Sequence, residues 1–232
     1  MPSRLIKTDS DIKAILEAVR IIDVVYDKIT TSYIKEGMTE LDIALLVYKF
    51  VIEEGGDGLS FNTIAAFGEN GCEPHHVPSK DKKLEKGMLV TLDMGAVKDG
   101  QCSDFTRTFG FGFVNDEQKK IYEIVKRSKD LAVDALAEGY SCKGIDKIAR
   151  DVIVNEGYGE YYIHGTGHGV GCEIHEAPTL NTKSEEILQN NEVVTVEPGI
   201  YLPNKMGVRI EDMYIIGKTG ALSKIPTNLI VL

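Results

Sequence analysis

The sequence predicts an α+β fold built from two similar halves, roughly residues 1–113 and 114–232. The first observation is a repeat: Leu-Val-Thr-Leu-Asp-Met-Gly at 89–95 returns as Val-Val-Thr-Val-Glu-Pro-Gly at 193–199. The second is that each half shows two helical patterns and then β-branched runs. The third is size, because an isolated half could not easily bury its sheet face. We therefore expect one domain spanning residues 1–232.

Two helices are predicted in each half. In the first, apolar residues at helical spacing from Ile12 to Ile22 follow the start signal Thr8-Asp9-Ser10. The second begins at Thr39 and ends at Gly55-Gly56. The second half contributes helices over 117–137 and 144–156, the latter ending at Gly157.

The predicted strands are β-branched and apolar runs bounded by turn signals, at 88–97, 101–113, 192–202 and 207–216. Asp99-Gly100 between the first two runs is a strong hairpin signal. If these are the central turn residues, Asp93 faces Thr106 and Asp104 lies diagonally on the same face. Diagonal neighbours have Cα atoms ~7–8 Å apart, so the two carboxylates can converge.

The repeat extends beyond its first match, in the same order and at nearly constant offset. The matched pairs are Glu36-Gly37-Met38-Thr39 with Glu138-Gly139-Tyr140-Ser141, Gly71-Cys72-Glu73-Pro74-His75 with Gly171-Cys172-Glu173-Ile174-His175, Leu84–Gly95 with Leu188–Gly199, and Asp104 with Glu211. Ordered matches of this kind indicate a duplicated fold whose halves share one polar centre.

Composition excludes several classes of function. A net charge of −10 argues against a nucleic-acid partner and is typical of a solvated surface. No stretch approaches the ~18–20 apolar residues of a membrane span. The segment Met-Pro-Ser-Arg-Leu-Ile-Lys at 1–7 has no signal-peptide core. The four cysteines lack C-x-x-C spacing, which favours reduced thiols and a cytoplasmic location.

Four carboxylates occupy duplicated positions: Asp93 and Asp104 in the first half, Glu197 and Glu211 in the second. A carboxylate in an apolar strand is costly unless it is paired or binds a metal. Four such groups in one site would repel each other without cations, and two divalent ions neutralise them. The alternative, four ordinary surface acids, fits neither the apolar strands nor the repeated placement.

All five histidines lie in two short stretches, His75 and His76 in the first half and His164, His168 and His175 in the second. A lone histidine is more often structural, but this clustering favours a site, less so for His76. Glycines around residues 164–171 allow close approach of the backbone. Oxygen ligands with one imidazole suit Mn²⁺, Fe²⁺, Co²⁺ or Zn²⁺, and the sequence does not choose among them.

Together the motifs resemble the pita-bread-fold metallopeptidases of the creatinase and methionine aminopeptidase superfamily, nearest the prolidase and aminopeptidase P branch. The resemblance covers essentially the whole chain and implies a curved antiparallel sheet with pseudo-twofold halves. Its motifs are Pro74-His75-His76, Leu92-Asp93-Met94-Gly95-Ala96, Cys102–Phe109, His164–Gly171, Ile174-His175-Glu176, Val196–Tyr201 and Gly207–Asp212.

The resemblance implies two divalent metal ions held by Asp93, Asp104, His168, Glu197 and Glu211, with Asp104 and Glu211 bridging them. It implies hydrolysis by a metal-bridging hydroxide, with Glu197 as the proton shuttle.

The resemblance also implies that His75, His164 and His175 position the substrate and stabilise charge on the carbonyl oxygen. Arg209 is expected to bind a substrate carboxylate or to orient neighbouring acids. The alternative for Arg209 is a simple ion pair with Asp212.

The activity implied is hydrolysis of Xaa-Pro bonds, in dipeptides or in small peptides with proline at the second position. One alternative is a methionine aminopeptidase or broader aminopeptidase, which the compact length fits but the segment Gly207–Asp212 opposes. Another is a non-catalytic module of the same fold, which would lack the ligands that are all present here. The branch usually carries an additional N-terminal domain, so we expect a lone catalytic domain or an expressed fragment. The sequence leaves the oligomeric state open, with a homodimer as one alternative.

Overall fold

The computed structural model describes residues 5–232. In this part of the chain, each of the four long helices begins at a residue whose side chain caps it. The helices are α1 (Asp9–Lys28), α2 (Glu40–Glu53), α3 (Asp116–Asp134) and α4 (Cys142–Asn155). Thr8, Thr39, Asn115 and Ser141 each accept a hydrogen bond from a backbone amide in the first turn, which satisfies an otherwise unpaired donor. Each helix begins within two residues of its predicted start, and a π-helical turn, Ile29–Tyr33, continues α1. Residues 1–4 of the segment 1–7, for which the sequence predicts no signal-peptide core, lie outside the described residues.

Six strands form the sheet region of the first half. They are β1 (Gly58–Leu59), β2 (Ile64–Phe67), β3 (Leu89–Met94), β4 (Ala96–Lys98), β5 (Gln101–Cys102) and β6 (Phe105–Gly110). The predicted hairpin register is confirmed, since Lys98 pairs with Gln101 and Asp93 pairs with Thr106. Asp99 and Gly100 are both in the left-handed region that this turn requires.

The second half repeats the pattern with β7 (Gly167–Gly169), β8 (Glu176–Leu180), β9 (Val193–Val196), β10 (Gly199–Leu202), β11 (Met206–Arg209) and β12 (Asp212–Ile215). Short 3₁₀ turns lie at Gly68–Cys72 and Gly159–Tyr161. Strands β1, β2, β7 and β8 lie outside the predicted runs because they are short and rich in Gly, Ala or Pro, which weakens any strand pattern.

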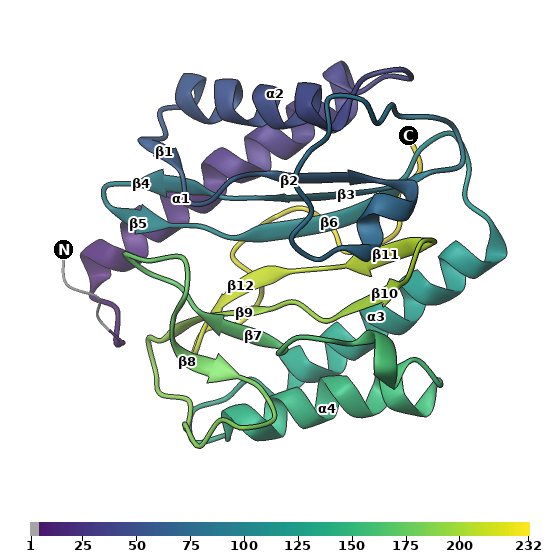
Figure 1. Cartoon of the computed structure of the whole chain (residues 1–232). Coiled ribbons are helices and arrows are strands. Elements are labelled where there is room, and N and C mark those ends of the chain that lie inside the picture. The colour runs from purple at the N-terminus through teal and green to yellow at the C-terminus, as the bar shows by residue number, and fades with distance from the viewer. Residues whose placement is uncertain (1–4) are drawn as a thin grey trace.

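Pairing among the described strands is antiparallel but divided over four small sheets, rather than one curved sheet. Gly95 separates β3 from β4, and Glu197-Pro198 separate β9 from β10, so each predicted long strand is interrupted. The halves meet at a bridge between Thr106 and Glu211. Figure 1 shows α1 and α2 on one side of these strands and α3 and α4 on the other, as pseudo-twofold halves require.

Each helix pair buries an apolar cluster against its own strands, one centred on residues such as Val47, Phe50 and Leu92, the other on Val125 and Val194. These two clusters hold the strands that converge on the seam between the halves. Within residues 5–232, no helix has both the length and the apolar character needed to cross a membrane. All four cysteines are free.

Candidate active site

A cavity of about 560 Å³ lies between the two halves. Its lining includes every site residue that the sequence predicts, together with His76: Asp93, Asp104, Glu197, Glu211, His75, His164, His168, His175 and Arg209. Apolar side chains such as Phe61, Val77 and Ile174 line the same cavity. The cavity thus combines an acidic floor with apolar walls.

Asp93 and Asp104 are brought together by the glycine of the first repeated motif. Asp93 lies in β3 and Asp104 precedes β6, and both side chains are buried. Between them Gly95 packs so tightly that a Cβ atom there would lie 2.1 Å from the Ser103 carbonyl oxygen. Only glycine allows this approach, so the motif glycine is needed to place the two acids side by side.

Glu197 and Glu211 come from the equivalent positions of the second half. Glu197 directly follows β9, and its amide donates to Thr166 O at 2.8 Å. Glu211 directly precedes β12, and its Oε2 accepts a hydrogen bond of 2.6 Å from Thr106 Oγ1. The Thr106 side chain of one half therefore orients the acid of the other.

His168 contributes an imidazole to the four carboxylates. Its Nε2 lies 3.2 Å from Glu197 Oε1 and 3.5 Å from Asp104 Oδ2. Its Nδ1 donates to the Gly169 carbonyl at 3.1 Å, which fixes the ring with Nε2 facing the acids. His175 packs edge-on against the same ring.

These residues fit a bound divalent metal. Asp104, His168 and Glu211 each offer a ligand atom, and the three atoms lie within 4.8 Å of one another. Asp93 Oδ1 and Glu211 Oε1 are buried and have no hydrogen-bond partner among residues 5–232. A buried carboxylate oxygen without a partner is costly, and coordination of a cation removes that cost. Asp93 is held at its other oxygen by Arg209 Nη2, at 2.6 Å.

Burial and mutual repulsion raise the pKa values of Asp93, Asp104 and Glu211, and least for Asp93, where Arg209 opposes the effect of burial. Burial raises the pKa of Asp104 well above its usual value, and the charges of Glu211, Asp93 and Glu197 add to the effect. Burial, with Glu197 and Asp93, likewise raises the pKa of Glu211 well above its usual value. Without cations, the site therefore retains protons on carboxyl groups that would be ionised in water.

Glu197 and His168 instead form an ion pair. For Glu197, burial raises the pKa, but the hydrogen bond and charge of His168 outweigh it and lower the pKa to about 2. For His168, burial lowers the pKa, but Glu197 outweighs it and raises the pKa to about 9. In the metal-free site a protonated His168 thus occupies the position of a cation beside Glu197.

Arg209 and Tyr201 connect Asp93 to His164. Arg209 Nη1 donates to Tyr201 Oη at 2.8 Å, and that oxygen lies 2.8 Å from His164 Nε2. The ion pair of Arg209 with Asp212, considered from the sequence as the alternative, is wrong. Asp212 lies on the opposite face of its strand and pairs with Arg107 and Lys129 instead.

Tyr201 and Thr106 are functional residues that sequence reasoning did not single out. Tyr201 ends the motif Val196–Tyr201 that contains Glu197, and it lies in β10, the strand that follows this acid. Thr106 is the predicted cross-strand partner of Asp93. The positions of both residues can be read from the sequence, but their hydrogen-bond partners cannot: Tyr201 Oη bonds to Arg209 and His164, and Thr106 Oγ1 bonds to Glu211.

The remaining histidines differ in role. Burial lowers the pKa of His164, and burial together with the nearby charge of His168 lowers that of His175, so both rings are neutral at pH 7. His75 lines the cavity with an exposed side chain. His76 is held by Glu40 of α2, 2.7 Å away, and that carboxylate also accepts from Ser79 N. His76 therefore anchors the loop that carries His75, in line with its weaker prediction as a site residue.

The duplicated helix–strand halves and the acid-lined cavity at their seam define the pita-bread fold. The chain belongs to metallopeptidase family M24, whose sequence model matches residues 13–218.

Relatives and solved structures agree on this fold. The Xaa-Pro dipeptidase of Pyrococcus furiosus is 42% identical over 218 residues, covering 94% of this chain and 62% of the relative. The structure of an Xaa-Pro dipeptidase from Bacillus anthracis superposes with a TM-score of 0.96 at 43% identity, covering 99% of this chain and 64% of that one. An X-Pro aminopeptidase from Thermotoga maritima gives 0.95 at 35% identity, covering 99% and 65%. The chain thus spans somewhat less than two thirds of the length of these proteins.

Proposed function

We propose that this chain carries the active site of a metal-dependent exopeptidase that hydrolyses Xaa-Pro bonds, in dipeptides or at the N-termini of small peptides. The observation that carries the proposal is the convergence of four carboxylates and one imidazole in a cavity of about 560 Å³, a volume that suits a small peptide. The names of the relatives, Xaa-Pro dipeptidase and X-Pro aminopeptidase, support the same bond specificity.

Two divalent ions are proposed to bind Asp93, Asp104, His168, Glu197 and Glu211, and Mn²⁺, Co²⁺, Zn²⁺ and Fe²⁺ all suit these donors. When bound, such a pair supplies Lewis acidity at the scissile carbonyl and lowers the pKa of water. Four carboxylates then face four positive charges, which removes the repulsion that raises the pKa values of Asp104 and Glu211.

The side chains of the protein have separate proposed tasks. Glu197, with a pKa of about 2, is ionised at neutral pH and can accept a proton at its carboxylate. The neutral ring of His175, together with His75 at the rim, supplies N–H groups to the substrate carbonyl. His164 donates its single N–H to Gly165 O at 2.7 Å and accepts from Tyr201 Oη at 2.8 Å, so its task is to position Tyr201 beside the substrate. The Arg209 guanidinium is already bonded to Asp93 and Tyr201, which supports a role in orienting these groups over direct binding of a substrate carboxylate.

A matched peptide panel tests the bond specificity. We expect kcat/KM at least ~10-fold higher for Ala-Pro than for Ala-Ala in the presence of Mn²⁺, Co²⁺ or Zn²⁺, with metal content measured alongside. Gly-Pro-Xaa peptides separate a dipeptidase from an aminopeptidase. Turnover of Met-Ala-Xaa alone would overturn the proposal in favour of a methionine aminopeptidase. Fewer than one ion bound per chain, with no turnover, would favour a non-catalytic module.

Metal binding is expected to release protons. His168 must be neutral to coordinate a metal, yet its pKa is raised to about 9 in the metal-free protein, so at pH 7 it has to lose a proton. Titration calorimetry in buffers of different ionisation enthalpy should show at least one proton released at pH 7. The number of protons released per chain should be smaller above pH 9, where His168 is already neutral before metal binds. Equal proton release at pH 7 and above pH 9 would contradict the ion pair of His168 with Glu197.

Location and assembly complete the proposal. Four free thiols are consistent with the predicted cytoplasmic location, since reducing compartments keep cysteines unpaired. A homodimer is the alternative to a monomer, and light scattering of the purified protein distinguishes the two.

A further inference from the structure

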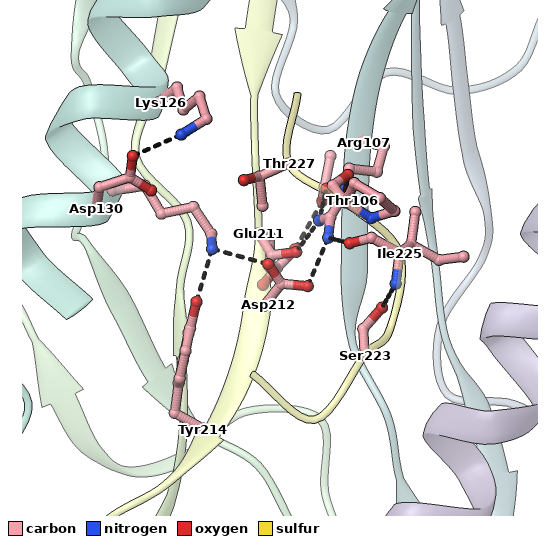
Figure 2. Close-up of polar contacts among 12 residues, drawn as sticks. Thr106, Arg107, Lys126, Asp130, Glu211, Asp212, Tyr214, Ser223, Ile225 and Thr227 are labelled. Atoms are coloured by element: carbon pink, nitrogen blue, oxygen red, sulfur yellow. Dashed lines mark hydrogen bonds and ion pairs between the residues drawn. The ribbon is translucent and has the colours of Figure 1, made fainter. Parts of the chain in front are cut away.

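A buried charged network lies directly behind the candidate active site. Lys129 of α3, Asp212 of β12 and Arg107 of β6 have exposed fractions of only 2%, 1% and 2%. Lys129 Nζ donates to Asp212 Oδ2 at 2.7 Å, and Arg107 Nη2 donates to Asp212 Oδ1 at 2.7 Å. Figure 2 shows Asp212 between the arginine and the helix, with Tyr214 below as a further partner. The network therefore joins both halves and a helix through one carboxylate.

Arg107 holds the backbone at the seam between the halves. Its Nη1 donates to two carbonyl oxygens, Thr106 O at 3.0 Å and Glu211 O at 2.6 Å. These two residues form the bridge between the halves, and their side chains meet on the cavity side at 2.6 Å. Alternation along each strand places Thr106 and Glu211 towards the cavity and Arg107 and Asp212 behind it.

All five N–H donors of Arg107 are used. Besides Asp212 and the two carbonyls, Nη2 donates to Ile225 O at 2.7 Å and Nε to Pro226 O at 3.1 Å. Only a guanidinium offers five donors in a rigid fork, so lysine cannot replace it here. The Arg107 side chain thus bonds to the seam between the halves, to the Asp212 carboxylate and to the C-terminal segment at Ile225-Pro226 (Figure 2).

Packing alone does not explain this arrangement. Two buried cations share one carboxylate, and buried ion pairs are often no more stable than apolar side chains of similar volume. Among residues 5–232, Lys129 has one further hydrogen-bond partner, Tyr214 Oη at 2.7 Å, and burial lowers the pKa of Lys129 despite Asp212. The network lies directly behind the strands that bring the four carboxylates together, with Asp212 next to Glu211 in the chain.

We propose that Lys129, Asp212 and Arg107 are positioning residues of the metal centre: they hold Glu211 at the correct distance from Asp104 and so set the affinity for the second of the two ions. The inference rests on the proposed metal-dependent function. A bridging carboxylate must span two ions ~3.5–4 Å apart. A tolerance of ~0.5 Å in such sites requires a rigid support. Arg107 supplies that support because it bonds the Glu211 backbone to that of Thr106, two residues from Asp104.

The test compares Lys129→Met with Lys126→Met. Lys126 lies one turn earlier on α3 and makes an ion pair of the same length with Asp130, 2.7 Å, but on the surface (Figure 2). Mn²⁺ is titrated into each metal-free protein and into the unchanged protein, with calorimetry for affinity and electron paramagnetic resonance for spin coupling between paired ions. Circular dichroism confirms that each variant is folded.

We expect Lys129→Met to bind the weaker ion ~10-fold less tightly and to lose the spin-coupled signal, while Lys126→Met behaves as the unchanged protein. Lys129→Arg, which keeps the charge beside Asp212, should restore most of the affinity. Two ions bound with unaltered affinity and coupling in Lys129→Met would overturn the inference alone. Fewer than two ions in the unchanged protein would also overturn the inference, and the proposed function falls with it only if Ala-Pro is not hydrolysed.

A second variant covers the case in which Lys129→Met does not fold. Tyr214→Phe removes only the hydroxyl partner of Lys129 and keeps the ring. We expect it to weaken the same ion about threefold, the effect of one lost hydrogen bond. Wild-type affinity in a folded Tyr214→Phe would then count against the proposal.

Discussion

Glu211→Gln is expected to abolish activity at ordinary metal concentrations and to weaken metal binding at least ~100-fold. Glutamine keeps an oxygen for the hydrogen bond from Thr106, so the strand is undisturbed. It cannot, however, present two charged oxygens to two ions. Dialysis against graded Mn²⁺ concentrations, followed by metal analysis and assay with Ala-Pro, measures both effects. Activity should return in part at millimolar metal.

The same substitution should stabilise the metal-free protein. The pKa of Glu211 is raised well above its usual value by burial and by Glu197 and Asp93, so its ionised form is disfavoured in the folded state. Stability from this group is present below pH 4.5 and is lost as the pH rises towards the raised pKa. At pH 7 Glu211→Gln avoids that loss, and we expect a Tm increase of about 2–4 °C.

Glu173→Gln provides the matched control for Glu211→Gln. Glu173 is exposed and precedes His175 in the loop beside the cavity, so it undergoes the same chemical change without burial. It should alter neither metal affinity nor Tm. Normal metal retention in Glu211→Gln would contradict its proposed role as a ligand.

Glu197→Gln is expected to lower kcat by ~10²–10⁴ with a much smaller change in KM. The amide cannot accept a proton, whereas Glu197 is ionised with a pKa of about 2. Added metal should not restore activity, which distinguishes this variant from Glu211→Gln. Steady-state kinetics with Ala-Pro at saturating Mn²⁺ provides the measurement.

A second readout of Glu197→Gln needs no activity. Because Glu197 raises the pKa of His168 to about 9, its loss should lower that pKa by at least ~1 unit in the metal-free protein. Titration of the His168 ring by NMR measures the change. Glu192→Gln is the control, because Glu192 is buried directly before β9, the strand that Glu197 follows, and its carboxylate accepts from Gln189 N. A kcat loss of equal size in Glu192→Gln would refute the assignment to Glu197.

The hairpin register was predictable from the sequence because it depends on neighbours along the chain. Asp99-Gly100 requires left-handed backbone at both positions, and this sets Asp93 opposite Thr106. The helix starts were predictable for the same reason, since a capping residue and the amide it accepts from are three residues apart. The short strands β7 and β8 carry glycine and proline in place of a strand pattern, and pairing with distant segments decides them.

The partners of charged side chains were not predictable. Arg209 and Asp212 are three residues apart, yet Arg209 pairs with Asp93 of the other half and Asp212 with Arg107 and Lys129. Strand alternation places the two side chains on opposite faces, and only packing of the halves shows what each face meets. Tyr201 was missed in the same way, because its hydroxyl bonds to Arg209 of the neighbouring strand and to His164, 37 residues away, and no local pattern indicates either contact.

The sequence by itself determined the duplicated halves, the four acids at equivalent positions and the clustering of all five histidines. These follow from local patterns: periodicity, turn residues and a repeat. Only the tertiary structure decided how far apart those groups lie and which of them carry protons. It set the 3.2 Å contact that lowers the pKa of Glu197 and raises that of His168. It also placed the Lys129–Asp212–Arg107 network behind the seam. Burial and charge act between segments a hundred residues apart, and no pattern along the chain encodes their distance.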